Sequence, residues 1–185
     1  MAEQRHQSFA PLVQPASRLL ILGSLPSAKS LAAQQYYAHP QNQFWRLLDQ
    51  VCGVPLSPLD YDARLNMLHH CRIGLWDVVQ SASRRSSSDS DIKDAAPQDL
   101  LALLGEYPNI SAIAFNGSKA SQIGRRILRE KGEWLNLPIS NAASAEISER
   151  HLRLFDLPSS SAANTMAFDR KAAAWAVLAP YARSD

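Results

Sequence analysis

Four short apolar segments, separated by longer stretches of helical patterning, limit the folds open to this chain of 185 residues. The segments are residues 18–23 (RLLILG), 73–79 (IGLWDVV), 110–115 (ISAIAF) and 151–157 (HLRLFDL). Short apolar runs that end near turn-forming residues are typical of buried strands. Strands that alternate with helices predict a parallel sheet with helices on both of its faces.

Between these runs, helices are expected at residues 28–35, 41–52, 61–69, 97–104, 118–130 and 168–181. Apolar side chains recur on one face of the 41–52 segment, and Pro97 suits the first position of its helix. A serine-rich stretch, 81–90, is expected to be a loop, either solvated or functional. We therefore predict a three-layer α/β/α fold with a central four-stranded parallel sheet. The whole chain, 1–185, is expected to form a single domain, with an irregular N-terminal lead-in over 1–17.

The composition is that of an ordinary globular protein, with 46% hydrophobic and 19% charged residues. No apolar run approaches the ~20 residues of a membrane span, and the polar N-terminus lacks the apolar centre of a signal peptide. We therefore expect no membrane association and a cytoplasmic location. Cys52 and Cys71 are expected to be buried or incidental thiols rather than a disulfide scaffold. The net charge of +2 decides nothing about a nucleic-acid partner.

Several familiar catalytic motifs are absent from the sequence. The chain has neither of the glycine-rich phosphate loops GxGxxG and GxxxxGK[ST], no GxSxG elbow and no HExxH histidine pair. The adjacent His69 and His70 would point in different directions on a helix. We therefore expect no metal ion and no organic cofactor.

Polar residues collect after the predicted strands. Ligands of an open parallel sheet bind beyond the carboxyl ends of its strands, so four loops are expected to converge there: 23–30, 77–91, 116–119 and 158–164. The segment 36–45, YYAHPQNQFW, follows soon after the first strand. Aromatic rings beside amides suit nucleobase recognition, because the ring stacks on the base and the amide reads its edge.

Three segments carry a resemblance to the uracil-DNA glycosylase superfamily. Residues 19–27, LLILGSLPS, resemble its first motif, a strand followed by G-x-x-P. The 36–45 segment resembles the F-A-H-P-x-N-x-F-W of the mismatch-specific uracil glycosylases, and residues 157–164, LPSSSAAN, resemble the second motif. The combination is similar to the sixth family of the superfamily, the hypoxanthine-DNA (deoxyinosine) glycosylases.

One departure from the uracil pattern bears on the substrate. The mismatch-specific uracil glycosylases carry a catalytic asparagine at the third position of the first loop, where this chain has Leu25. A leucine side chain can neither orient water nor polarise a bond. The resemblance to the hypoxanthine glycosylases implies that Asn42, the asparagine of H-P-x-N, takes over this role.

The resemblance also implies roles for the other polar residues. Asn42 would position the attacking water, and Asp77 would accept the N1–H of hypoxanthine or assist water as a base. Tyr37 would stack on the extruded base. Three further residues are assigned to the base: Ser24, Leu25 and Asn116. Five are assigned to the DNA backbone: Ser27, His39, Ser159, Ser160 and Ser161.

Each assignment has a structural alternative. Asn42 also suits a helix N-cap, Tyr37 suits core packing, and Asp77 suits a cap after a strand. Asn116 precedes a glycine and suits a turn, as do the serines, while His39 suits either loop shaping or general acid catalysis. Three aromatic neighbours are assigned to the core: Tyr36, Phe44 and Trp45.

The sequence thus predicts a monofunctional glycosylase that releases deaminated bases, chiefly hypoxanthine, from double-stranded DNA as a monomer. No lysine is identified for Schiff-base chemistry, so strand cleavage by the enzyme itself is not expected. A uracil or mismatch-specific glycosylase is one alternative, against which Leu25 argues. A non-catalytic domain that binds nucleotides or damaged DNA is another. Residues 161–163 are all small, so no residue is identified that would fill the gap left by an extruded base.

Overall fold

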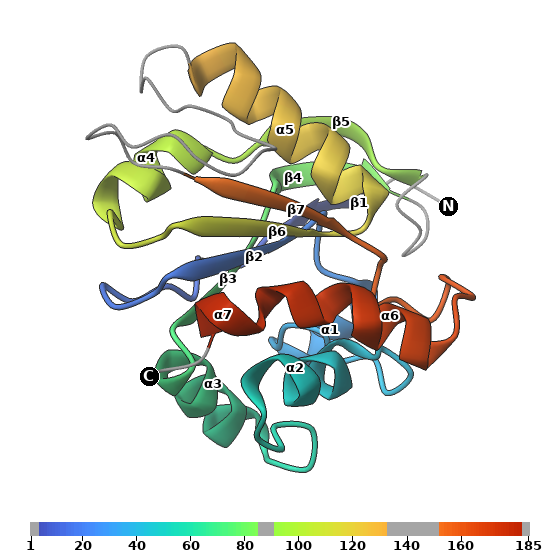
Figure 1. Cartoon of the computed structure of the whole chain (residues 1–185). Coiled ribbons are helices and arrows are strands. Elements are labelled where there is room, and N and C mark those ends of the chain that lie inside the picture. Colours follow the sequence, from blue (N-terminus) through green and yellow to red (C-terminus); the bar gives the residue numbers. More distant parts are fainter. Residues whose placement is uncertain (1–3, 85–90, 133–151, 183–185) are drawn as a thin grey trace.

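The computed structural model describes residues 4–84, 91–132 and 152–182, and its architecture is the predicted three-layer α/β/α fold (Figure 1). The central sheet has four parallel strands in the order β3-β2-β6-β7. Their bounds are β2 Leu19–Gly23, β3 Ile73–Asp77, β6 Ala112–Asn116 and β7 Arg153–Leu157. All four predicted strands are present, although His151, the first residue predicted for the last one, lies outside the described residues.

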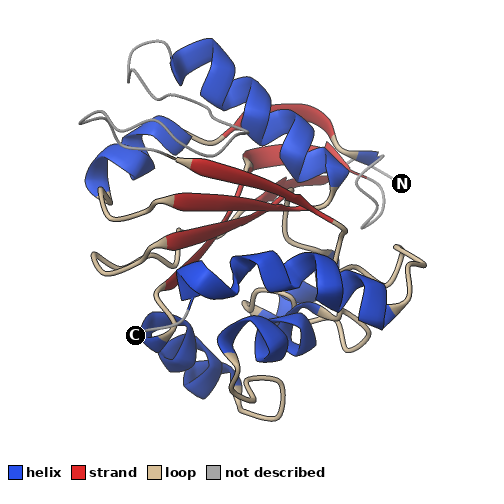
Figure 2. Cartoon of the chain, in the orientation of Figure 1, coloured by secondary structure: helices blue, strands red, loops and turns tan. Residues whose placement is uncertain are grey.

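Side chains of the central strands alternate between two hydrophobic clusters. In β2, Leu19 and Ile21 enter one cluster, whereas Leu20 and Leu22 enter the other. The first cluster is covered by α2 (Phe44–Cys52), α3 (Tyr61–His70), α6 (Phe168–Trp175) and α7 (Ala179–Ala182). The second is covered by α4 (Leu100–Glu106) and α5 (Ser118–Gly132). Figure 2 shows the strands between these two helical layers.

A second sheet of three antiparallel strands, in the order β1-β4-β5, was not predicted. Its strands are β1 Gln4–Gln7, β4 Val79–Arg84 and β5 Lys93–Pro97. The prediction of an irregular lead-in over 1–17 is therefore wrong for β1, and the prediction of a loop over 81–90 is wrong as far as Arg84. Residues 85–90 lie outside the described residues. Because these strands are rich in polar residues, no apolar periodicity in the sequence indicates them. The pairing of β1 with β4 also joins segments that are far apart in the sequence.

The predicted helices are present, with two starts misplaced: the helix expected over 41–52 begins at Phe44, and the one expected from Pro97 begins at Leu100. Pro97 is the last residue of β5 at the edge of its sheet, a position that tolerates proline because no ladder donor is needed there. The α4 helix begins at Leu100, and Asp99 caps it by accepting a hydrogen bond from the Ala102 amide at 3.2 Å. The remaining helix of the N-terminal half is α1, Ala28–Ala33, and a 3-10 turn, Ala176–Leu178, joins α6 to α7.

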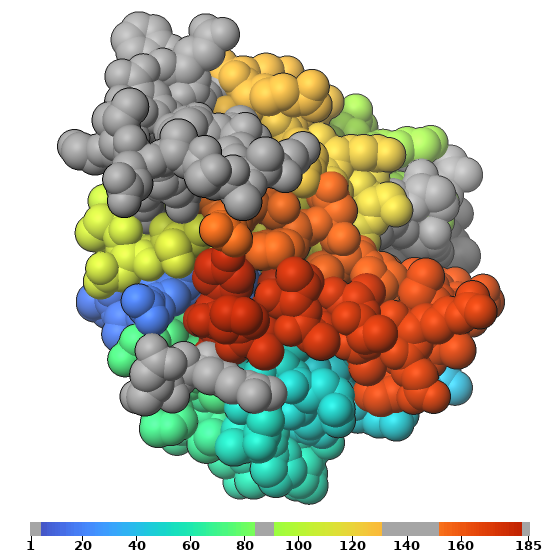
Figure 3. All heavy atoms as spheres, in the orientation of Figure 1, coloured from blue at the N-terminus to red at the C-terminus, as the bar shows by residue number. Residues whose placement is uncertain are grey.

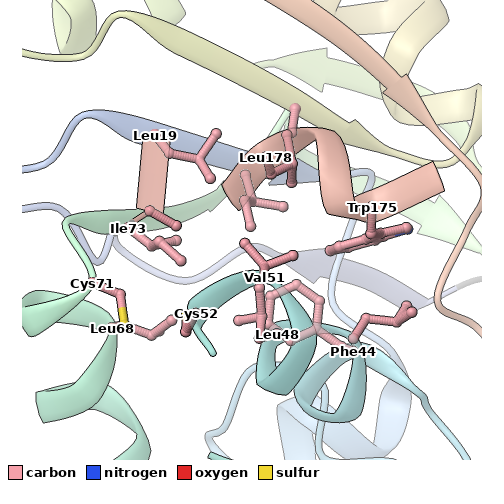
Figure 4. Packing of buried hydrophobic residues seen from close by; sticks show 14 of the residues in the cluster. Leu19, Phe44, Leu48, Val51, Cys52, Leu68, Cys71, Ile73, Trp175 and Leu178 are labelled. Atoms are coloured by element: carbon pink, nitrogen blue, oxygen red, sulfur yellow. The ribbon is translucent and has the colours of Figure 1, made fainter. Parts of the chain in front are cut away.

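Buried aromatic and aliphatic side chains fix α2 against the C-terminal helices. Phe44 and Trp175 are fully buried, with ring centroids 5.9 Å apart in an edge-to-face arrangement (Figure 4). The Trp175 indole N–H donates to the Pro158 carbonyl at 3.0 Å, which ties α6 to the segment after β7. Cys52 and Cys71 are both buried, and neither forms a disulfide, as expected.

The register of the central sheet brings the strand ends to one level. Gly23 pairs with Asp77 across β2 and β3, and Asn116 pairs with Leu157 across β6 and β7. The polar residues that follow these strands therefore meet at one edge of the sheet. Within the described ranges, no helix has both the length and the apolar character needed to cross a bilayer.

Candidate active site at the carboxyl edge of the sheet

A cavity of about 540 Å³ lies at this edge of the central sheet. Its walls come from the loop after β2, the 36–42 segment, the end of β3, the start of α5 and the segment after β7. The structure brings together all of the site residues predicted from the sequence except His39. Those that line the cavity are Ser24, Leu25, Ser27, Tyr37, Asn42, Asp77, Asn116, Ser159, Ser160 and Ser161.

Tyr37 is held in a conformation that non-glycine residues rarely adopt. Its φ angle is 55°, in the left-handed region, which costs roughly 1–2 kcal/mol for an L-residue. One face of its ring stacks on Phe44, with centroids 3.6 Å apart and planes 14° apart. Phe44 is fully buried at the start of α2, so the helix fixes the ring of Tyr37 in the cavity wall. Strain of this kind is often found where a binding site demands one orientation.

Asn42 lines the cavity and also holds the start of α2. Its side-chain Oδ1 accepts a hydrogen bond from the Phe44 backbone N–H at 3.0 Å. The backbone N–H of Asn42 donates to the His39 carbonyl at 2.8 Å. The N-cap position weighed for Asn42 is taken by Gln43, which makes no side-chain cap bond, and Asn42 instead satisfies the first helical amide from the residue before it. Among the described residues, none bonds the Nδ2 group of Asn42. An amide oxygen also has a second lone pair, so capping leaves this side chain able to bind a ligand or water.

Asp77 is a buried carboxylate, with 3% of its surface exposed. Its Oδ2 accepts a hydrogen bond from the Ser8 hydroxyl at 2.7 Å. A Cβ atom on Gly23 would lie 2.6 Å from Asp77 Oδ1 and 3.1 Å from the Tyr37 hydroxyl oxygen. Gly23 therefore allows the carboxylate and the tyrosine to approach the end of β2, a contact that any other residue would obstruct.

Asp77 also affects the tyrosine beside it. Tyr36 is 3% exposed, and burial, reinforced by the negative charge of Asp77, raises the pKa of its hydroxyl far above the ordinary value. Tyr36 belongs to the core, as do Phe44 and Trp45, which confirms those three assignments. Tyr36 nevertheless contributes to the cavity wall as well.

Asn116 is occupied by the segment after β7. Its Nδ2 donates to the Ser160 hydroxyl at 2.9 Å, and its Oδ1 accepts from the Ser160 amide at 2.8 Å. The Ser160 carbonyl in turn accepts from the Gln43 amide at 2.9 Å. Asn116 and Ser160 are both buried, so together they join β6, the second motif and the start of α2 around the cavity.

The remaining serines make local bonds as well as lining the cavity. Ser27 caps α1 by accepting from the Ser30 amide at 3.1 Å. Ser159 and Ser161 accept turn hydrogen bonds from the Ser161 and Ala163 amides, at 3.2 and 3.3 Å. The turn chemistry weighed for these residues is therefore observed.

Leu25 and His39 differ in their relation to the cavity. Leu25 is buried and contributes an apolar part of the wall. His39 is outside the lining, and its Nδ1 accepts from the Gln41 amide at 3.1 Å. This bond shapes the loop that carries Asn42.

Several residues around the cavity were not identified from the sequence. Ser8 reaches Asp77 from the N-terminal segment, and Lys119 and Gln122 of α5 line the wall. Lys171 is fully buried in α6, and its ammonium group donates to the Ser161 and Asn164 carbonyls at 3.4 and 2.9 Å. Burial lowers the pKa of Lys171. A lysine at an apolar position of an amphipathic helix, in line with Trp175, is the signal that could have drawn attention to it.

Comparisons with known proteins agree with this geometry. Residues 10–179 match the sequence profile of the uracil DNA glycosylase superfamily. A Methanosarcina acetivorans protein named hypoxanthine DNA glycosylase is 40% identical over 144 residues, which cover 77% of this chain and 90% of the relative. A Methanosarcina barkeri protein of the same name is 36% identical over 140 residues, covering 76% and 88%.

A solved structure gives the same relationship in three dimensions. The solution NMR structure of a Methanosarcina acetivorans protein, assigned as a candidate uracil DNA glycosylase, superposes with a TM-score of 0.75. The two chains are 35% identical, and the match covers 96% of this chain and 99% of the other.

Proposed function

Because the chain belongs to the uracil DNA glycosylase superfamily, we propose that it is a DNA glycosylase that hydrolyses the N-glycosidic bond of deaminated bases, chiefly hypoxanthine in deoxyinosine. One observation carries the proposal. A tyrosine ring, a carboxamide and a buried carboxylate line a single cavity, in a chain 40% identical to a protein named hypoxanthine DNA glycosylase. The cavity volume of about 540 Å³ lies within the roughly 300–1,000 Å³ that is usual for small-molecule sites.

The cavity walls suit the recognition of an extruded purine. Tyr37 lines the cavity and its ring is held by stacking on Phe44, so we assign it to stack on the base, which is how aromatic residues commonly hold flipped bases. Hypoxanthine has an N1–H donor where adenine has an N1 lone pair. The Asp77 carboxylate accepts from that donor and repels the lone pair, so it favours the deaminated base.

The reaction breaks the bond between C1′ and N9, and the electron pair leaves with the base. Positive charge then develops on the sugar, water adds to C1′ and loses a proton, and the base anion takes up a proton to leave as neutral hypoxanthine. Asn42 positions this water, and preorganised polar groups around the base stabilise the negative charge that it acquires. The side chain of Leu25, in the first loop, has no polar atom with which to share these tasks. We further propose that the protein acts as a monomer on double-stranded DNA in the cytoplasm.

A cleavage assay on a panel of substrates tests this function. The protein is incubated with duplexes that contain inosine, uracil, xanthine or ethenoadenine, and abasic sites are then revealed with alkali. We expect strand breaks chiefly at inosine. Breaks mainly at uracil would instead support the uracil glycosylase alternative, and binding of inosine DNA without base release would support a non-catalytic domain.

Omission of the alkali step tests whether the enzyme is monofunctional. Lys119 lines the cavity, although the sequence motifs identify no lysine there. We expect the strand to stay intact until alkali is added, because the proposed reaction uses water as the nucleophile. Breaks without alkali, together with trapping of a covalent adduct by borohydride that Lys119→Met abolishes, would show lyase activity.

A further inference from the structure

The segment between β7 and α6 projects from the molecule beside the cavity. Figure 1 shows it at the edge where the parallel strands end, and Figure 3 shows its atoms on the surface there. Ala163 and Asn164 of this segment line the cavity. Two residues further along, Met166 is 42% exposed, and the only comparably exposed large hydrophobic residue in the described part of the chain is Val177.

The projecting segment is held by a set of short-range bonds. The Asn164 amide donates to the Ser161 carbonyl at 3.1 Å, and the Met166 amide donates to Asn164 Oδ1 at 3.0 Å. The buried Lys171 of α6 also holds the segment, because its ammonium group donates to the Ser161 and Asn164 carbonyls. Met166 is therefore an apolar side chain presented to solvent on an ordered backbone.

Extrusion of a base leaves a gap in the DNA stack. Proteins that deform DNA commonly insert an apolar side chain, methionine among them, between neighbouring bases. Of the residues in this segment that line the cavity, the three serines and Ala163 are too small to replace a base, and the side-chain oxygen of Asn164 is bonded to the Met166 amide. Met166 has the required bulk, and its flexible, polarisable thioether adapts well to irregular surroundings.

We propose that Met166 enters the DNA stack in the space vacated by the extruded nucleotide. This inference rests on the proposed function, since it requires a base in the cavity. The side chain acts by holding the duplex open rather than by touching the reacting atoms. Met166 should therefore increase the rate of release of a base from duplex DNA and have little effect on a base that is already unstacked.

Single-turnover base release from inosine in duplex and in single-stranded DNA tests the proposal. The variants are Met166→Ala, Met166→Leu and, as the matched control, Val177→Ala. Since unstacking opposes extrusion only in the duplex, we expect Met166→Ala to slow release from duplex DNA about tenfold or more. Release from the single strand should stay within about twofold of wild type, and Met166→Leu should restore duplex activity. Val177→Ala should leave both rates unchanged.

A second readout follows extrusion itself. With 2-aminopurine beside the inosine, the rise in fluorescence on binding should be smaller for Met166→Ala than for wild type. Equal losses on both DNA forms, or unchanged duplex release, would overturn the role of Met166 while leaving the proposed function intact. No release by the wild-type protein from either DNA form would overturn the proposed function and, with it, this inference.

Discussion

At the residue scale, Asn42 combines a structural bond with a place in the cavity wall. Its Oδ1 holds the Phe44 amide, and Phe44 in turn supports the ring of Tyr37. Loss of the side chain would therefore affect both the start of α2 and the proposed water site. A substitution at position 42 that keeps an oxygen to accept from the Phe44 amide, but loses the carboxamide, separates the effect on stability from the effect on catalysis.

We predict that Asn42→Ala lowers single-turnover release of hypoxanthine by roughly 10²- to 10³-fold, the range for losing one preorganised polar group at a reacting centre. It should also lower the free energy of unfolding by about 1 kcal/mol, as loss of a helix cap does. Asn42→Ser, whose hydroxyl oxygen can still accept from the Phe44 amide, should recover most of the stability and little of the activity. Urea denaturation and base release measure the two effects, and full activity in Asn42→Ser would leave Asn42 only its capping role.

At the scale of elements, α6 supports the segment after β7 through one buried charge. The ammonium group of Lys171 is the donor to both the Ser161 and Asn164 carbonyls. Hydrogen bonds to charged groups contribute roughly 1.5–3 kcal/mol, but burial of the charge opposes this gain. The net effect on global stability should therefore be small, and the effect on the local order of the segment should be large.

We predict that Lys171→Met increases amide hydrogen exchange over residues 161–166 by about tenfold or more, because the bonds that restrain their carbonyls are lost. Release of hypoxanthine from duplex DNA should fall, and the midpoint of thermal unfolding should change little. Arg170→Met, at an exposed position of the same helix, is the matched control and should leave the exchange unchanged. Unaltered exchange in Lys171→Met would show that other contacts hold the segment.

At the scale of the whole molecule, the N-terminal segment brings the half-buried Ser8 to Asp77, at the end of β3, and the charge of Asp77 acts on the buried Tyr36. Burial and the charge of Asp77 raise the pKa of Tyr36 above its ordinary value of 10.0. Above about pH 10 the unfolded chain loses this proton while the folded chain keeps it. The folded state then binds more protons, so its stability falls as the pH rises.

We predict that Tyr36→Phe reduces the loss of unfolding free energy between about pH 9 and pH 11, because it removes one proton that the folded state must retain. Urea denaturation at a series of pH values measures this slope. Tyr181→Phe, in α7 rather than beside Asp77, is the matched control and should keep the wild-type slope. Identical slopes in wild type and Tyr36→Phe would contradict the raised pKa.

The sequence by itself determined the central sheet, the order of its helices and the segment that resembles the glycosylases. These features depend on local patterns, namely short apolar runs for β2 and β6 and a recurring apolar face for α2. The segment 36–45 is likewise continuous in the chain, so its resemblance to the glycosylases can be recognised from the order of its residues alone.

Only the tertiary structure decided which residues meet. Ser8 reaches Asp77 across 69 positions, and Arg5 pairs with Ser83 in the second sheet, although nothing in the spacing of either pair signals the contact. The burial of Lys171 likewise depends on how α6 packs. The physical reason is that side-chain periodicity reports the environment of one element, whereas partners distant in sequence are set by how the elements pack together.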